Sequence, residues 1–232
     1  MSALVLAKVS GVVFDLDGTL VDSRRDIAEA ANHALAKNGY AQLPHAELES
    51  FVGDGAPLLM SRAARLDVKD ERVTGLVSDF LDYYAEHPID HTGLMPGALQ
   101  ALDDLQHYAL GVCTNKPRRT SLAVIRGLDL EARFVGLVAG DDLPLCKPNP
   151  APVVEAARRM GVPVNEVIMV GDGPQDVLSG RAAGAYTVGV RGGIQPFERL
   201  AASNPDCLID TLAELAPIVR ALASSRSGVR GG

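Results

Sequence analysis

The chain has 232 residues, of which 47% are hydrophobic and 22% charged, a composition that suits a large folded core and not a disordered chain. Its formal net charge of -7 argues against nucleic acid and anionic membranes as partners. The three cysteines lack paired, metal-type spacing and fit a reducing compartment, so a cytoplasmic protein is expected.

Short β-branched runs alternate with helical patterns, which is typical of a parallel sheet wrapped by helices. The first strand is predicted over residues 9–14, and the apolar run leading into it lacks the cleavage pattern of a signal peptide. Further strands are predicted over residues 109–114, 134–139, 167–170, 186–190 and 207–209. The expected fold class is therefore α/β, and no apolar run approaches the roughly 20 residues of a membrane span.

The segment 21–91 separates the first two strands and shows helical periods without a convincing strand. Its first helix is predicted to start after Ser23, as the N-cap, and to end before Gly39. Apolar stripes over residues 58–66 and 73–84 predict two more helices. We expect a helical cap over residues 21–91 on a core of residues 1–20 and 92–223, followed by a disordered tail, 224–232.

Two carboxylates follow the first predicted strand. Asp15 and Asp17 would point to the same side of an extended chain, and Gly18 permits a tight turn whose N–H groups can face a phosphate. Aspartate and glycine are also common turn residues, so a turn with an aspartate as helix cap is the alternative for this motif alone.

Further polar side chains follow two other predicted strands or precede a helix. Thr114 and Asn115 end the second strand, although such residues also cap helices. Lys147 is restrained by prolines before a helix predicted over residues 151–160. Asp172 and Asp176 follow the strand 167–170, and Asp176 could instead be the N-cap of the next helix. Open α/β sheets bind ligands at the carboxyl ends of their strands.

In this order, the motifs resemble those of the haloacid dehalogenase superfamily. They are DxDGT from Asp15, then Thr114, then Lys147, then GDxxxD with Asp172 and Asp176. The helical insert resembles the C1-type cap of that superfamily, so the resemblance covers nearly the whole chain. It implies a Rossmann-like core and a magnesium-dependent phosphoric monoester hydrolase that works through an aspartyl-phosphate.

The resemblance also implies a role for each motif residue. Asp15 is the nucleophile and Asp17 the general acid and base, while Thr114 and Lys147 hold phosphate oxygens beside Gly18 and Asn115. The ligands of Mg²⁺ are Asp15, the backbone carbonyl of Asp17, Asp172 and, directly or one step removed, Asp176. Elementary electrostatics agrees, because a carboxylate that attacks a phosphate dianion needs cations to neutralise the pair. Gly173 departs from the pattern, since many relatives carry serine or threonine there.

The insert holds the evidence on the substrate. Gly53, Gly55 and Ala56 resemble the substrate-side loop of phosphoglycolate phosphatases, and the helix that follows could receive a carboxylate at its N-terminus; an ordinary glycine loop is the alternative. The arginines of the insert, Arg24, Arg25, Arg62 and Arg65, are expected on solvated helix faces.

We therefore expect a small phosphate ester as the partner, with 2-phosphoglycolate as the leading substrate. The alternatives are a sugar, amino-sugar or nucleotide phosphate, pyrophosphate, a phosphohexomutase reaction, or a phosphate-binding regulator without turnover. A monomer and a homodimer are both compatible with the sequence.

Overall fold

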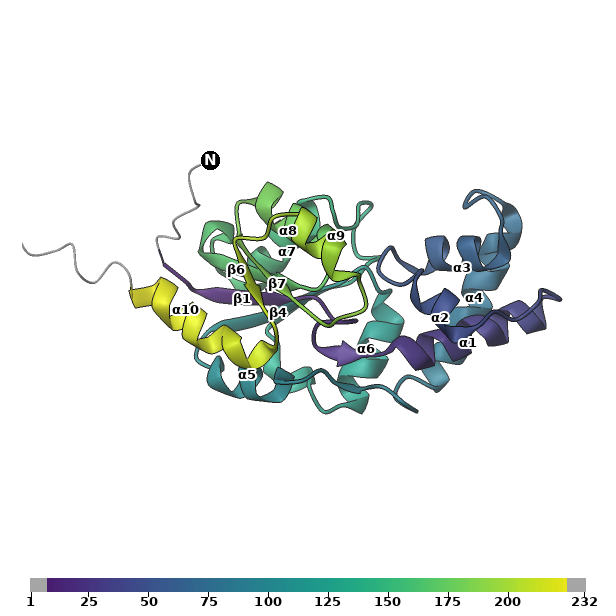
Figure 1. Cartoon of the computed structure of the whole chain (residues 1–232), viewed down its shortest axis with the longest axis horizontal. Helices are drawn as coiled ribbons and strands as arrows, with labels where there is room; N and C mark the ends of the chain where they lie inside the picture. Colours follow the sequence, from purple (N-terminus) through teal and green to yellow (C-terminus); the bar gives the residue numbers. More distant parts are fainter. Residues whose placement is uncertain (1–7, 225–232) are drawn as a thin grey trace, which may run out of the picture.

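The computed structural model describes residues 8–224, and a six-stranded parallel sheet forms the centre of its larger part (Figure 1). The strand order is β5-β4-β1-β6-β7-β8. The strands are β1 (Gly11–Phe14), β4 (Ala109–Cys113), β5 (Gly136–Val138), β6 (Val167–Gly171), β7 (Tyr186–Val190) and β8 (Cys207–Ile209). All six predicted strands are confirmed, with small differences at their ends.

Helices cover both faces of this sheet. Val12 and Phe14 of β1 pack into one apolar cluster with α5 (Ala98–Asp104), α6 (Arg118–Gly127) and α10 (Leu215–Ser224). Val13 points the other way and packs with α7 (Ala151–Met160). The remaining helices of this part are α8 (Pro174–Ala183), α9 (Phe197–Ala202) and three short 3-10 helices, Glu131–Arg133, Val164–Glu166 and Leu212–Glu214. Burial on both faces explains why β1 is apolar throughout.

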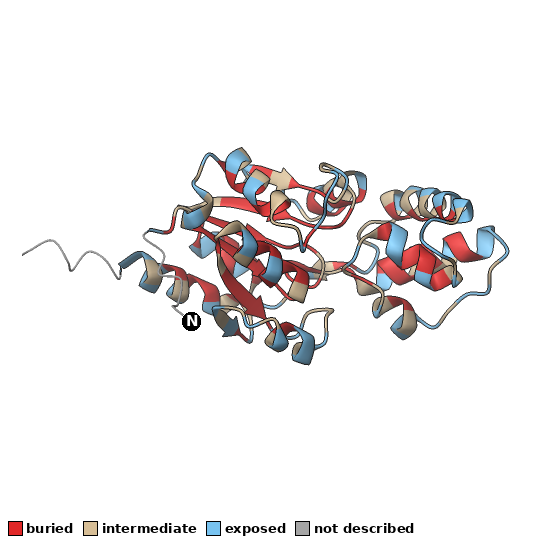
Figure 2. Cartoon of the chain, turned by 90° about the horizontal axis from the view of Figure 1, so that it is seen from above, coloured by how far each residue is buried: buried red, intermediate tan, exposed pale blue. Residues whose placement is uncertain are grey.

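The inserted segment folds into four helices that lie together beside the sheet (Figure 1). They are α1 (Arg24–Lys37), α2 (His45–Glu49), α3 (Ala56–Ala64) and α4 (Glu71–Glu86). Figure 2 shows buried residues inside this group as well as along the sheet. The structure confirms the three predicted helices, whereas α2 escaped prediction because its five residues include one buried apolar side chain, Leu48.

The two connections between sheet and insert pair with each other. β2 (Val21–Asp22) and β3 (Gly93–Leu94) form an antiparallel ladder, in which Val21 faces Leu94. The prediction that the insert contains no strand is therefore wrong at its first two residues, because so short a strand has no readable period. The ladder holds the entry and exit of the insert side by side.

Two predictions concern the ends of the chain. Ser224 is the last residue of α10, so the predicted disordered tail starts with a helical residue. Residues 225–232, and residues 1–7 of the apolar N-terminal run, lie outside the described part. Within residues 8–224, no helix combines the length and apolarity that crossing a membrane would require.

Candidate active site

The strand register brings three of the predicted motifs to one edge of the sheet. Phe14 of β1 pairs with Val112 of β4 on one side and with Val170 of β6 on the other. The backbone N–H of Asp15 then donates to Val170 O over 2.9 Å. Asp15, Thr114 and Asp172 therefore leave neighbouring parallel strands at nearly the same level.

Three carboxylates meet at this edge. One oxygen each of Asp15, Asp172 and Asp176 lie within 4.8 Å of one another, and the exposed fractions of the three residues are 6%, 1% and 1%. Burial and, to a smaller extent, the charge of Asp176 raise the pKa of Asp15 to about 8 and that of Asp172 to about 7. A divalent cation would relieve this repulsion. Because Mg²⁺ prefers hard oxygen ligands, the three residues fit it.

Lys147 places a positive charge next to these carboxylates. Its Nζ donates to Asp15 Oδ1 over 2.8 Å, to Asp176 Oδ1 over 2.6 Å and to the carbonyl of Cys113 over 2.6 Å. Burial lowers the pKa of Lys147, but Asp15 and Asp176 together raise it above its ordinary value, so the ammonium stays charged. Asn115 binds the Lys147 backbone at both its N–H and its carbonyl.

Asp172 is fixed by the backbone around it. Its Oδ2 accepts hydrogen bonds from Ile194 N over 2.6 Å and from Gln195 N over 3.0 Å. Gly18 has a φ of +83°, and a Cβ at this position would lie 2.4 Å from Asp172 Oδ2. Only glycine fits here, because a side chain would displace the carboxylate.

Asp176 is the third residue of α8 and not its N-cap. Gly173 occupies the N-cap position, and its N–H donates to Asp176 Oδ2 over 3.1 Å. The alternative role of Asp176 as the N-cap is therefore wrong. A Cβ on Gly173 would lie 2.4 Å from the side chain of Gln175, so Gln175 fills the space that a serine or threonine would need.

A cavity of about 40 Å³ lies between this edge of the sheet and the insert. Of the predicted site residues, it is lined by Asp15, Asp17, Thr114, Asn115, Gly53, Gly55 and Ala56. Apolar side chains of the insert, Ile27, Val52, Leu59 and Phe80, form much of the rest of the wall. The structure thus brings the predicted substrate-side loop and the motifs at Asp15 and Thr114 around one small space, whereas Lys147, Asp172 and Asp176 are not part of its lining.

The cavity lining includes two polar residues that sequence reasoning missed as site residues. Lys116 Nζ lies 3.0 and 3.2 Å from the two oxygens of Asp17, and it donates to the hydroxyl of Tyr84 over 2.6 Å. Lys116 could have been found, because it follows Thr114 and Asn115 directly. Tyr84 carries no such signal, since its apolar stripe predicts only a buried helix face.

Ser23 occupies the N-cap position of α1, as predicted, but its hydroxyl makes no capping hydrogen bond. It donates instead to Asp17 Oδ1 over 2.5 Å. The side chain predicted to cap the first helix of the insert therefore contacts Asp17 of the candidate site.

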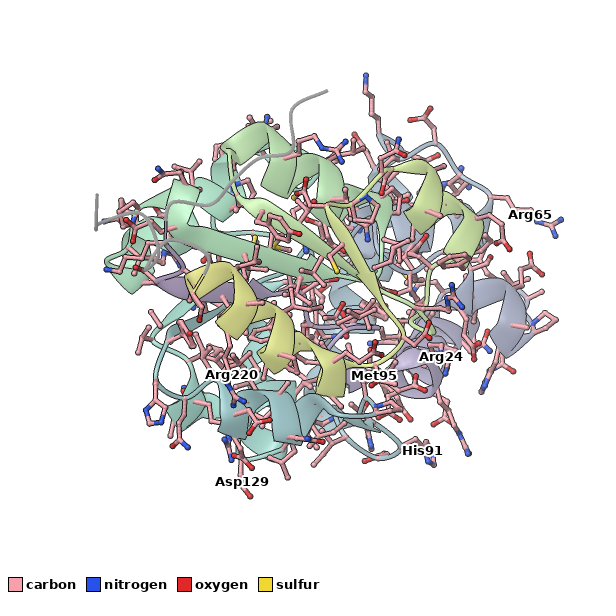
Figure 3. The ribbon with its side chains drawn as sticks, turned by 60° about the vertical axis from the view of Figure 1, so that its left-hand side comes forward. Arg24, Arg65, His91, Met95, Asp129 and Arg220 are labelled. Atoms are coloured by element: carbon pink, nitrogen blue, oxygen red, sulfur yellow. The ribbon has the colours of Figure 1, made fainter. Side chains whose placement is uncertain are left out.

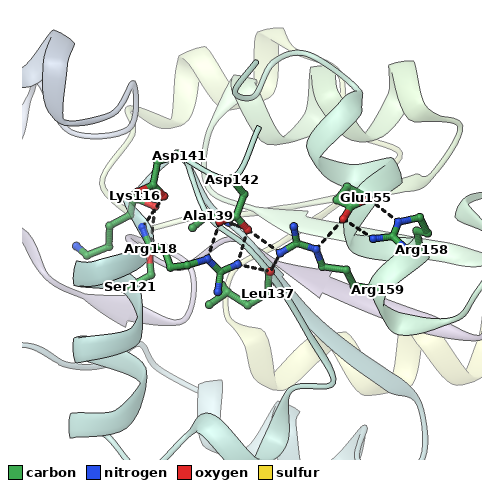
Figure 4. A network of polar contacts seen from close by, with 10 residues as sticks. All are labelled: Lys116, Arg118, Ser121, Leu137, Ala139, Asp141, Asp142, Glu155, Arg158 and Arg159. Atoms are coloured by element: carbon green, nitrogen blue, oxygen red, sulfur yellow. Dashed lines mark hydrogen bonds and ion pairs between the residues drawn. The ribbon is translucent and has the colours of Figure 1, made fainter. Parts of the chain in front are cut away.

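An ion-pair network anchors the loops that carry Thr114 and Lys147 (Figure 4). Asp142, which follows β5, accepts from Arg118 of α6 and, over 2.6 Å, from Arg159 of α7. Hydrogen bonds from Arg118 hold the pKa of Asp142 at about 2. The network joins the start of α6 and the end of α7 to the loop that follows β5.

The arginines of the insert lie outside the cavity wall. Arg24 pairs with Asp22 and Arg62 with Asp54. Arg65 is exposed and projects from the edge of the molecule (Figure 3). The expectation that these side chains are solvated fits their exposure.

Comparison with known proteins identifies the family. Residues 12–190 match the model of the haloacid dehalogenase-like hydrolase family. A phosphoglycolate phosphatase of Rhodospirillum rubrum is 40% identical over 186 residues, which are 76% of this chain and 77% of the relative. One from Haemophilus influenzae is 34% identical over 215 residues, 89% of this chain and 96% of the relative.

Solved structures agree with the sequence relatives. The crystal structure of a predicted phosphoglycolate phosphatase from Haemophilus somnus superposes with a TM-score of 0.81 at 28% identity, covering 90% of this chain and 97% of that one. The parallel sheet and the inserted helices are thus shared along almost the full length of both proteins. The chain belongs to the haloacid dehalogenase-like hydrolase family.

Proposed function

We propose that the protein is a magnesium-dependent phosphatase that hydrolyses a small phosphate monoester through an aspartyl-phosphate on Asp15. The observation that carries the proposal is the contact of Lys147 Nζ with Asp15 Oδ1 at 2.8 Å, beside two further buried carboxylates that fit a divalent cation. A site that only bound phosphate would need neither a nucleophile nor a second carboxylate, Asp17, on the cavity wall.

The chain's own residues account for the steps. A carboxylate oxygen of Asp15 attacks phosphorus, and the bond to the leaving oxygen breaks while Asp17 gives that oxygen a proton. Asp17 then takes a proton from a water that attacks the aspartyl-phosphate, which releases phosphate and restores Asp15. Lys147 and the Thr114 hydroxyl bind non-bridging oxygens of the phosphoryl group. Asp15, Asp172, the Asp17 carbonyl and, directly or through a water, Asp176 would hold Mg²⁺, which would supply positive charge against the incoming phosphate.

We propose 2-phosphoglycolate as the substrate. Two facts support it: the names of the relatives and the small volume of the cavity, about 40 Å³. In this proposal, residues 21–91 act as a cap whose loop at Gly53, Gly55 and Ala56 faces the leaving group. The alternative esters are larger or lack a carboxylate.

An initial-rate panel with and without Mg²⁺ tests both parts of the proposal. It compares kcat/KM for 2-phosphoglycolate, sugar phosphates, nucleoside monophosphates, pyrophosphate and p-nitrophenyl phosphate. We expect magnesium-dependent phosphate release, fastest from 2-phosphoglycolate. If a sugar phosphate is better by about tenfold, or about 1.4 kcal/mol in transition-state binding, the proposed substrate is wrong. If p-nitrophenyl phosphate and all the others are inert, the chain is not a phosphatase.

A further inference from the structure

The carboxyl group of Asp17 is held from two sides. Ser23 Oγ donates to its Oδ1 over 2.5 Å, and Lys116 Nζ lies 3.0 Å from Oδ1 and 3.2 Å from Oδ2. The exposed fractions of the side chains are 5% for Lys116 and 12% for Asp17. Because the Lys116 and Asp17 side chains are both largely buried, the Asp17 carboxyl group has little freedom to rotate away from the cavity.

Lys116 is in turn held by the insert. Its Nζ donates to the Tyr84 hydroxyl over 2.6 Å and lies 4.1 Å from the centre of the same ring. Tyr84 belongs to α4, and only 1% of its surface is exposed. The chain of contacts from Asp17 through Lys116 to Tyr84 therefore crosses from the sheet edge to the insert.

We propose that Lys116 is a positioning residue: held by Tyr84, its ammonium group orients the Asp17 carboxyl for proton transfer to the leaving oxygen. This inference rests on the function proposed above. The proton moves from Asp17 to the leaving oxygen as the phosphorus–oxygen bond breaks, and Lys116 keeps all its protons throughout. Because Tyr84 comes from the insert, Asp17 is fully oriented only when the insert is closed over the sheet edge.

A lysine in this cavity has another conceivable use, namely binding a carboxylate of the substrate. An ammonium group has three N–H donors. Lys116 Nζ already lies within hydrogen-bond distance of three oxygens, two on Asp17 and one on Tyr84. The geometry therefore favours positioning, and the test below separates the two roles.

The test compares wild type, Lys116→Met and Lys116→Arg with three substrates in the presence of Mg²⁺. The leaving groups of phosphoglycolate and ethyl phosphate are both alkoxides that leave poorly without protonation. Only phosphoglycolate carries a carboxylate. p-Nitrophenyl phosphate has a leaving group that needs little protonation. Single-turnover release of each leaving group isolates the first half of the reaction, and a thermal melt checks that each variant is folded.

We expect Lys116→Met to slow the release of glycolate and of ethanol alike, by about tenfold to a hundredfold, because a misplaced catalytic acid loses part of its contribution to the rate. The release of nitrophenol should change less than about threefold. KM should stay close to that of wild type, and Lys116→Arg should restore part of the lost rate because it keeps the charge.

Other patterns overturn the inference. A loss confined to phosphoglycolate would make Lys116 a ligand of the substrate carboxylate. An equal loss with all three substrates, nitrophenol release included, would mean that Lys116 supports the site without acting through Asp17. If wild type itself hydrolyses none of the three, the proposed function fails, and not this inference alone.

Tyr84→Phe tests the link to the insert. It removes the hydroxyl that holds Lys116 and keeps the ring, so we expect the same pattern as in Lys116→Met, with a smaller loss of about threefold to tenfold. Tyr83→Phe is the matched control on the same helix, because the Tyr83 ring stacks on His33 and His87 away from the cavity lining. Equal effects of the two variants would contradict the proposed role of Tyr84.

Discussion

The two halves of the candidate site are built in different ways. The half at the sheet edge consists of Asp15, Lys147, Asp172 and Asp176, which come from strand ends, one loop and the start of α8. Within it, Lys147 contacts Asp15 and Asp176 directly. The half that we propose to face the leaving group consists of Asp17, Lys116, Tyr84 and the loop at Gly53, and it joins the sheet edge to the insert. The geometry of the first half therefore does not require residues of the insert, whereas the geometry of the second half depends on the position of the insert relative to the sheet.

The largest effect should come from the nucleophile. We expect Asp15→Asn to lower kcat by about a thousandfold or more with every phosphate ester, because its amide is a poor nucleophile. The melting temperature should change little, since asparagine has nearly the same size and Lys147 keeps its contact with Asp176. Asp103→Asn, at an exposed ion pair with Arg133, is the matched control and should keep full activity. Turnover in Asp15→Asn near the wild-type rate would break the assignment of the reaction to this half.

Magnesium should act on the same half in a pH-dependent way. The raised pKa values, about 8 for Asp15 and about 7 for Asp172, mean that the folded metal-free chain binds more protons than the unfolded chain. These groups favour the folded state at pH below about 4, and that contribution is lost as the pH rises toward 8. Because metal binding needs the ionised carboxylates, the affinity for Mg²⁺ should increase as the pH rises.

Thermal melts measure this effect. Mg²⁺ should raise the melting temperature more at pH 8 than at pH 6, and Asp172→Asn should reduce the shift. A chelator should remove the activity of wild type, and added Mg²⁺ should return it. A shift that is equal at both pH values, or unchanged in Asp172→Asn, would place the metal elsewhere.

The ion pairs of Asp142 should stabilise the fold around the sheet-edge half. Arg118 and Arg159 lower the pKa of Asp142 from 3.8 to about 2, so their stabilisation is present above pH 4 and is lost as the pH falls toward 2. We expect Asp142→Asn to lower the unfolding free energy at pH 7 by about 1 to 2 kcal/mol, and by less at pH 3. Urea unfolding at both pH values measures it. A difference that grows at pH 3 would contradict the assigned cause.

The smallest expected effect concerns the half that faces the leaving group. Val52→Ala removes bulk from the cavity wall, so kcat/KM for larger phosphate esters, p-nitrophenyl phosphate included, should rise by a few-fold relative to that for 2-phosphoglycolate. Val73→Ala is the matched control, because Val73 is buried in α4 outside the cavity lining. Parallel changes in both variants would point to loosening of the insert and not to the wall.

The sheet-edge half is readable from the sequence because its motifs follow continuous apolar strands. The proximity of Asp15 and Asp172 follows from the rule that parallel strands end at one edge of a sheet, and the register of β1 with β6 agrees with it. The other half is hidden because it depends on contacts between distant segments. Lys116 and Asp17 are 99 residues apart, and Tyr84 reaches them from a helix whose pattern indicates burial alone. The sequence predicts Ser23 as a helix cap, and only the tertiary structure shows that its hydroxyl contacts Asp17.

One measurement tests the central claim that Asp15 carries the phosphoryl group. In Asp17→Asn, p-nitrophenyl phosphate should still phosphorylate Asp15, because its leaving group needs little acid help, while hydrolysis of the aspartyl-phosphate loses its base. We predict a burst of nitrophenol equal to the enzyme concentration. Mass spectrometry of the acid-quenched protein should then find one phosphoryl group on the peptide that contains Asp15. Turnover without a burst and without this adduct, or an adduct on another residue, would contradict the account.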